Sequence, residues 1–262
     1  MFLDLCGAKL HFEQYGEGKP DVLLLHGWGC SIETWKAVTD RLARHSRVTV
    51  IDFPAHGQSG RPPEPWGAHE FSEQVAALIR ALHIEGCDVV GHSHGGRIAL
   101  TLAIEHPELV GKLALTGAAG LKGRPTEAQK KRSEEYKRLR AFADSLDKLK
   151  LLGPLPEKMR EALRKKYGSP DYNALDAEMR KTFVKLVSTD LTDRLCQVKA
   201  PTLLLWGTND AETPLWMGRV MEQSIPNCAL VELKGGSHFA FLEQLGFFCQ
   251  VLEQYLYGGT AC

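Results

Sequence analysis

A short motif at residues 91–95, Gly-His-Ser-His-Gly, constrains this sequence more than any other feature. It follows an apolar stretch of strand length at residues 87–90 and precedes a helix-like stretch at residues 96–103. A G-x-S-x-G motif between a strand and a helix is typical of a sharp, strained turn that lifts a serine hydroxyl out of a sheet. Glycine at both ends lets the chain reverse where a Cβ would collide with neighbouring backbone. The motif therefore predicts a strand–turn–helix unit that exposes Ser93.

Apolar runs of strand length alternate with amphipathic helical stretches over most of the chain. The runs lack an apolar/polar alternation, which fits strands covered on both faces, as in a parallel sheet. They are residues 22–26, 48–52, 88–91, 112–116, 202–206 and 229–233. Apolar residues at helical spacing predict helices at 71–82 and 241–255, and Thr213 followed by Pro214 predicts a helix start with Thr213 as N-cap. The pattern indicates an α/β fold, with a mostly parallel sheet and helices on both faces.

The alternation breaks between residues 121 and 195, where charge-rich helical stretches replace strands. We interpret this segment as an inserted helical lid, with a core made of residues 1–120 and 196–262. Residues 122–166 contain 15 Lys/Arg and 7 Asp/Glu, a net charge of +8. Such a charge is typical of a solvated helical face or of a mouth that attracts anionic substrates, and the sequence leaves both open. An apolar lid face is predicted from Leu146, Leu149, Leu151, Leu152, Met159 and Phe183.

Composition excludes several classes of protein. The 262 residues carry 32 basic and 32 acidic side chains, so no global charge favours nucleic acid. No apolar run approaches the ~20 residues that span a membrane, and the N-terminus lacks the pattern of a signal peptide. Seven scattered cysteines form neither a disulfide framework nor a zinc ribbon. We expect a cytoplasmic protein, and leave a monomer or a homodimer open.

A reactive serine needs a base and an acid that orients the base. In folds of this type both stand on loops after later strands, in the order Ser, Asp/Glu, His. Asp210 follows the predicted strand at 202–206, and His238 follows the one at 229–233. We therefore predict a triad of Ser93, His238 as general base and Asp210 as the orienting acid. Glu212 is the alternative acid.

An oxyanion hole needs two backbone N–H groups aimed at the developing negative charge. One is predicted to come from His94, directly after the nucleophile. The other is predicted to come from Trp28, in the first strand–helix loop, where Gly27 permits close approach of the substrate.

Five motifs together make the chain resemble the α/β-hydrolase superfamily over nearly its whole length. They are His-Gly-Trp-Gly at 26–29, Asp-Phe-Pro-Ala-His-Gly-Gln-Ser at 52–59, the serine motif with Gly96, Trp-Gly-Thr-Asn-Asp at 206–210 and Gly-Gly-Ser-His at 235–238. The resemblance implies acyl transfer to Ser93, a tetrahedral intermediate and hydrolysis of an acyl-enzyme. The loop at 26–29 looks like that of the pimeloyl carrier-protein methyl ester esterases.

Several branches of this superfamily fit the residues less well. Dehalogenases and epoxide hydrolases use Asp as nucleophile, whereas position 93 is Ser. His92, His94 and Phe239 depart from the residues typical of C–C hydrolases around the serine and the histidine. The prediction is a hydrolase of carboxylic esters with small or medium acyl or alcohol groups. The alternatives are a C–C bond (vinylogous diketone), lactone or thioester hydrolase and, outside enzymes, a ligand-binding protein.

Other residues near the motifs are candidates for the substrate pocket: Gly27, His56, Arg97 and Phe239. Arg97, on the helix after the serine, suits either an ion pair within the protein or a clamp for a substrate carboxylate. His92 and His94, with His26 and His56, raise the question of a metal. No carboxylate-rich ligand motif accompanies them, so we predict neither a metal nor a cofactor.

Overall fold

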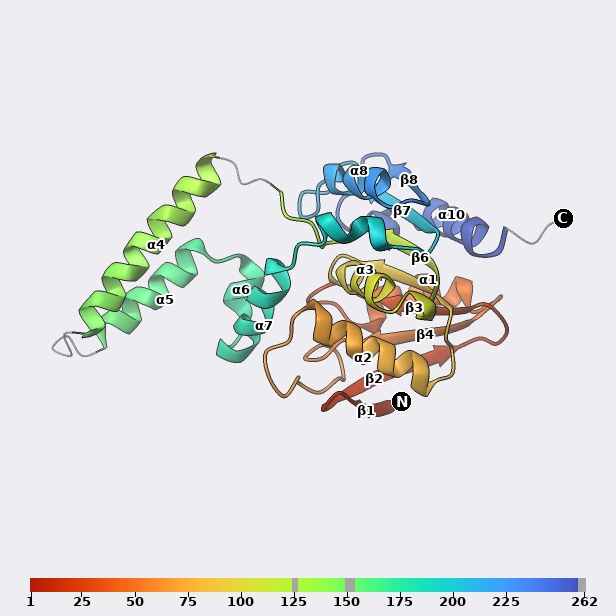
Figure 1. The fold of residues 1–262 in the computed structure, drawn as a ribbon, viewed down its shortest axis with the longest axis horizontal. Helices are drawn as coiled ribbons and strands as arrows, with labels where there is room; N and C mark the ends of the chain where they lie inside the picture. Colours follow the sequence, from red (N-terminus) through yellow and green to blue (C-terminus); the bar gives the residue numbers. More distant parts are fainter. Residues whose placement is uncertain (124–126, 149–153, 259–262) are drawn as a thin grey trace. The chain divides into compact units, whose positions relative to one another are not determined.

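A computed structural model describes residues 1–123, 127–148 and 154–258 of the chain. It divides into two compact units, Met1–Leu121 with Val184–Cys262, and Lys122–Phe183. The first unit contains all the strands of the described residues (Figure 1).

The first unit is built on one eight-stranded sheet with the strand order β1-β2-β4-β3-β5-β6-β7-β8 (Figure 1). The strand bounds are β1 Phe2–Leu5, β2 Ala8–Tyr15, β3 Asp21–Leu25, β4 Arg47–Asp52, β5 Cys87–His92, β6 Val110–Thr116, β7 Thr202–Gly207 and β8 Cys228–Leu233. The pairs β1–β2 and β2–β4 are antiparallel, and all other pairs are parallel. The six predicted strands and the mostly parallel sheet are confirmed.

Helices cover both faces of this sheet, as predicted. The α-helices of the first unit are α1 Lys36–Leu42, α2 Ala68–Ala81, α3 His94–Glu105, α8 Leu215–Ser224, α9 Ala240–Glu243 and α10 Leu245–Tyr257. Short 3-10 helices are η1 Ile32–Trp35, η2 Pro107–Leu109 and η3 Thr192–Gln197. One hydrophobic cluster contains the buried residues of α2, α3 and α8, and the other contains those of α1 and α10. Strand β3 feeds both, because Leu23 and Leu25 belong to the first cluster, and Val22 and Leu24 to the second.

The predicted helices differ from the observed ones in detail. The helix predicted at 241–255 is two helices, because the chain leaves the helical conformation at Gln244, with φ −122° and ψ 40°. Helix α8 has Pro214 as its N-cap and begins at Leu215, so the prediction that Thr213 caps this helix is wrong. Thr213 instead contacts the residues predicted to be catalytic, as described below.

The second unit is helical. It contains α4 Glu127–Lys148, α5 Leu155–Tyr167, α6 Pro170–Ala174 and the first part of α7 Ala177–Ser188. Arg160 of α5 joins α5 to α4, since its guanidinium donates to Asp144 and Asp147 at 3.1 Å. Of the residues predicted to form an apolar face, Leu149, Leu151 and Leu152 lie outside the described residues. A lid made of residues 121–195 stays a prediction.

No helix in the described part of the chain is long and apolar enough to cross a bilayer.

The sheet brings four loops together at one edge. In a parallel sheet the loops after the carboxyl ends of neighbouring strands meet at one edge, where α/β proteins bind ligands. The loops after β3, β5, β7 and β8 carry all the residues predicted to be catalytic or to form the oxyanion hole.

Close packing of α3 on β3 yields a stability prediction. A Cβ on Gly95 would overlap the carbonyl of Leu25 and lie 2.7 Å from the carbonyl oxygen of His26. Because these are backbone atoms that cannot rotate away, Gly95→Ala should lower the free energy of unfolding by at least ~2 kcal/mol. The matched control is Gly246→Ala at an exposed position of α10, where nothing lies within 4 Å of the added Cβ. It should raise that free energy by about 0.5–1 kcal/mol. Urea unfolding measures both, and equal effects would contradict the packing argument.

Candidate active site

Ser93 stands at the junction of β5 and α3 with φ 51° and ψ −111°. A positive φ is uncommon for a residue with a side chain and is concentrated at strained functional turns. A Cβ on Gly91 would lie 2.7 Å from the carbonyl oxygen of Gly95, so the turn requires glycine at 91. The Ser93 carbonyl accepts hydrogen bonds from the backbone N–H groups of Arg97 at 3.1 Å and Ala119 at 2.9 Å. These contacts fix a sharp turn at the carboxyl end of β5.

The loop after β3 is tied to this turn by the buried side chain of His26. Its Nδ1 donates to the carbonyl oxygen of Gly27 at 2.7 Å, and its Nε2 accepts from the backbone N–H of Phe53 at 3.0 Å. Burial lowers the pKa of His26 to about 3, so the ring is neutral, as this pattern of one donor and one acceptor requires. The His26 carbonyl also accepts from the N–H of Gly95 at 3.0 Å. The loop is therefore held against the start of α3.

The two groups predicted for the oxyanion hole stand on these two elements. His94 is the first residue of α3, so its backbone N–H has no acceptor within the helix. Gly27 precedes Trp28, and a Cβ on Gly27 would lie 2.8 Å from Nδ1 of His92 and 3.4 Å from Cβ of Ser93. Glycine at 27 thus keeps the loop within reach of the serine turn.

Asp210 and His238 meet across the loops that follow β7 and β8. Nδ1 of His238 lies 2.9 Å from Oδ2 of Asp210, and both side chains are buried. Oδ1 of Asp210 accepts from the backbone N–H groups of Glu212 and Thr213, both at 2.9 Å. Burial raises the pKa of Asp210, but the hydrogen bonds from His238 and Thr213 outweigh it and hold this pKa below its usual value. Asp210 is therefore ionised and fixed in orientation.

The alternative acid, Glu212, stands on the other side of the histidine ring. Its Oε2 lies 3.4 Å from Nε2 of His238, and its side chain is 66% exposed. Asp210, by contrast, is 1% exposed and faces Nδ1. In a Ser-His-Asp triad the acid binds Nδ1 and the serine binds Nε2. Asp210 therefore contacts the nitrogen that the acid of such a triad contacts, and Glu212 lies near the other nitrogen.

Thr213 is a member of this cluster that the sequence reasoning missed. Its Oγ1 lies 2.8 Å from the carbonyl oxygen of Gly117, 2.9 Å from Oδ2 of Asp210 and 3.2 Å from Nδ1 of His238. The Thr213 carbonyl accepts from Nε1 of Trp206 at 2.7 Å, which fixes the backbone. Thr213 thus connects the side chain of Asp210 to the loop after β6. Its local signal, threonine before proline, indicated a helix cap instead.

The side chain of His92 is hydrogen-bonded to the backbone of His238. Its buried Nε2 lies 3.0 Å from the carbonyl oxygen of His238, so Nε2–H is the donor. The His92 ring packs against the rings of His238 at 4.7 Å and Phe239 at 5.0 Å. Burial, with the nearby His238, lowers the pKa of His92 to about 3. His92 is therefore neutral and hydrogen-bonded to the backbone of His238, and Phe239 packs beside it.

His94 and His56 lie in an aromatic cluster rather than in a shared ligand set. The Trp28 ring meets the ring of His56 edge-on at 4.8 Å and that of His94 at 5.6 Å. Nδ1 of His56 bonds to the carbonyl oxygen of Pro54 at 3.0 Å. Burial lowers the pKa of both histidines. The group in the described residues that could ligate a metal is elsewhere: His69, Glu73 and Glu105.

Arg97 lies one helical turn after Ser93. It is half-buried, and its Nε is buried without a hydrogen-bond partner. Among the described residues it forms no ion pair, so the predicted alternative of an internal ion pair has no support there.

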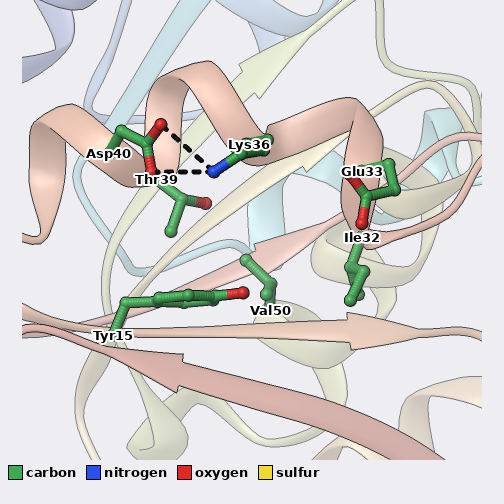
Figure 2. Close-up of a pocket in the computed structure, with 7 residues that line it drawn as sticks. All are labelled: Tyr15, Ile32, Glu33, Lys36, Thr39, Asp40 and Val50. Atoms are coloured by element: carbon green, nitrogen blue, oxygen red, sulfur yellow. Dashed lines mark hydrogen bonds and ion pairs between the residues drawn. The ribbon is translucent and has the colours of Figure 1, made fainter.

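A pocket away from these residues is drawn in Figure 2. It has a volume of about 20 Å³ and lies between η1, α1 and strands β2 and β4. The side chains of Lys36 and Asp40 are at its rim, 3.4 Å apart. A volume of this size holds about one water molecule. None of the residues predicted for the site lines it.

Comparison of the sequence with known protein families identifies the family of this chain. The family described as alpha/beta hydrolase fold matches residues 20–245. The chain belongs to this family. The predicted resemblance to the α/β hydrolases is thereby confirmed.

Similar proteins of this family include esterases. The chain is 30% identical to the pimeloyl-[acyl-carrier protein] methyl ester esterase of Chromobacterium violaceum, over 95% of this chain and 98% of that protein. It is 31% identical to the protein of the same name from Nitrosospira multiformis, over 90% of this chain and 93% of that one. Among solved structures, a hydrolase from Pseudomonas aeruginosa PA01 is similar with a TM-score of 0.75 and 25% identity, over 98% of both chains.

Proposed function

We propose that the chain is a serine hydrolase that cleaves carboxylic esters with small or medium acyl or alcohol groups. The observation that carries this proposal is the pair His238 and Asp210, joined at 2.9 Å through Nδ1. This pair stands on the loops after β7 and β8, and Ser93 occupies the strained turn after β5. The similarity to two methyl ester esterases supports ester hydrolysis.

In the first half-reaction Nε2 of His238 takes the proton of Ser93 Oγ as the oxygen attacks the ester carbonyl. Asp210 holds the proton on Nδ1 and stabilises the imidazolium that forms. The backbone N–H groups of Trp28 and His94 donate to the oxyanion of the tetrahedral intermediate. Collapse of the intermediate breaks the ester C–O bond, and Nε2–H protonates the leaving alcohol.

In the second half-reaction water replaces the alcohol. His238 takes a proton from water, which attacks the acyl-enzyme carbonyl, and the same N–H groups receive the second oxyanion. Collapse releases the carboxylic acid and returns the proton to Oγ of Ser93. Within this proposal, the helical segment 121–195 acts as a lid, and residues 1–120 and 196–262 form the catalytic core.

The test is ester turnover combined with active-site labelling. Initial rates on p-nitrophenyl esters of increasing acyl length should saturate with substrate, and the optimal length measures the acyl site. A fluorophosphonate should label one peptide, which contains Ser93, as read by mass spectrometry. A chain that binds the esters but neither turns them over nor reacts with the probe would be a ligand-binding protein. Labelling of Ser93 without ester turnover would favour lactone or vinylogous diketone substrates.

A further inference from the structure

Arg97 is a partly buried arginine with no carboxylate partner among the described residues, whereas Arg41 and Arg47 each have one. Arg41 pairs with Glu253 at 2.8 Å, and Arg47 pairs with Asp21 at 2.5 Å. For Arg97 no carboxylate within the described residues lies at ion-pair distance, and its buried Nε lacks any hydrogen-bond acceptor. A charged group removed from water without a partner is costly, so proteins rarely retain one by accident.

The guanidinium nevertheless keeps its charge. Burial lowers the pKa of Arg97 only to about 10, so the side chain is a cation at neutral pH. The neighbouring His94 does not add a second charge, because burial and the Arg97 cation hold the pKa of His94 well below its usual value. The result is one positive charge, unneutralised by the described residues, beside the start of α3.

The position of this charge is set by the backbone around the nucleophile. Arg97 is four residues after Ser93, which places its Cα roughly 6 Å farther along the helix axis. Ala119 donates to the carbonyl of Ser93 at 2.9 Å, and a Cβ on Gly120 would lie 3.9 Å from Cα of Arg97. The loop after β6 therefore runs beside both Ser93 and Arg97.

The same loop also reaches the acid–base pair. A Cβ on Gly117 would lie 3.0 Å from Oδ2 of Asp210 and 3.2 Å from Nδ1 of His238. Next to Arg97 the loop contacts an apolar side chain, since a Cβ on Gly120 would lie 3.3 Å from Cδ1 of Leu191. Arg97 is thus a lone cation in partly apolar surroundings, about one helical turn from the bond-forming serine.

We propose that Arg97 binds an anionic group of the substrate, so that the preferred esters carry a carboxylate a few bonds from the scissile carbonyl. Half-esters of short dicarboxylic acids represent this class. A carboxylate would accept the hydrogen bonds of the guanidinium fork and neutralise its charge. This inference rests on the proposed function, because it names the substrate class of the same site.

A binding experiment tests the subsite without requiring turnover. In a Ser93→Ala background, which leaves esters intact, monomethyl glutarate should bind about 10- to 100-fold more tightly than its neutral isostere, the monomethyl ester of glutaric acid monoamide. Isothermal titration calorimetry gives both dissociation constants. When Arg97→Met or Arg97→Gln is added to the Ser93→Ala variant, the dissociation constants of the two esters should become equal. Arg219→Met is the matched control, because Arg219 is exposed and pairs with Glu232 at 2.9 Å, and it should leave the ratio unchanged.

Thermal unfolding separates a binding role from a structural one. Without ligand, Arg97→Met should melt at the same temperature as the parent or higher, since it removes an unpaired, partly buried charge. Excess glutarate should raise the melting temperature of the parent and not that of the variant. A variant that melts several degrees lower without ligand would show that Arg97 is structural and would overturn the inference.

Kinetics distinguish failure of this inference from failure of the proposed function. In the wild-type chain the ratio of kcat/KM for monomethyl succinate, glutarate or adipate to that for the matching neutral amide should exceed ~10 for at least one length. Equal values for all pairs, with turnover that depends on Ser93, would overturn the anion subsite and leave the esterase standing. Tight Arg97-dependent binding with no hydrolysis of any ester would overturn the esterase proposal and leave the anion subsite standing.

Discussion

Replacing Ser93 with alanine should lower kcat for a p-nitrophenyl ester by roughly 10⁵- to 10⁶-fold. Without Oγ no acyl-enzyme forms, and the remaining rate comes only from binding and the oxyanion N–H groups acting on water. The fold should be unaffected, because the bonds at this turn use the backbone of residue 93: its N–H donates to Thr116 at 3.2 Å, and its carbonyl accepts from Ala119. Circular dichroism and the melting temperature check that the variant is folded.

Ser237→Ala is the matched control for this prediction. Ser237 directly precedes His238 and is the serine of the loop that carries the predicted base. Its hydroxyl bonds to the carboxylate of Glu243, so it is occupied elsewhere. This variant should keep activity within about tenfold of wild type and should still react with a fluorophosphonate. Loss of labelling in Ser237→Ala, together with retained activity in Ser93→Ala, would show that the nucleophile is Ser237 and not Ser93.

The central part of the fold could be predicted because both faces of the inner strands are buried. Five consecutive buried residues in β3 leave a continuous apolar run, which is readable without knowing the partners of the strand. Strands β1 and β2 leave no such run. They pair antiparallel at the edge of the sheet, and β2 mixes buried residues with an exposed Lys9 and a half-buried Glu13. The short length of β1 and the polar residues that interrupt β2 account for their absence from the prediction.

The site was predictable to the extent that its residues follow strands in a fixed order. Ser93 directly follows a strand, Asp210 and His238 each stand a few residues after one, and topology then brings their loops to one edge of the sheet. Thr213 and His92 were assigned no such role, because each has a partner that is distant in sequence. Thr213 binds a carbonyl 96 residues away, and His92 binds one 146 residues away. Local patterns do not carry such contacts.

Arg97 illustrates a further limit. The sequence offered two interpretations, an internal ion pair and a substrate clamp, and no local pattern separates them. The difference is a matter of what surrounds the guanidinium in three dimensions. A buried Nε without an acceptor is visible only once the loop after β6 is placed beside α3.

Replacing Asp210 with asparagine should lower kcat by about 10⁴-fold. Oδ2 of Asp210 accepts the proton on Nδ1 of His238, and Oδ1 is engaged by two backbone N–H groups. Those two N–H groups keep the amide oxygen of asparagine at the Oδ1 position and turn its NH₂ toward Nδ1. The ring then carries its proton on Nε2, where a base for Ser93 must be unprotonated. Stopped-flow or steady-state rates on p-nitrophenyl acetate measure the loss.

Glu212→Gln is the control that makes this prediction specific to one carboxylate. Glu212 reaches Nε2 at 3.4 Å from an exposed position, so removing its charge should change kcat by less than about tenfold. Both variants remove one negative charge from the same loop, and they differ only in which nitrogen of His238 loses its carboxylate. If Glu212→Gln were the more damaging of the two, the orienting acid would be Glu212, and the 2.9 Å contact of Asp210 would be structural.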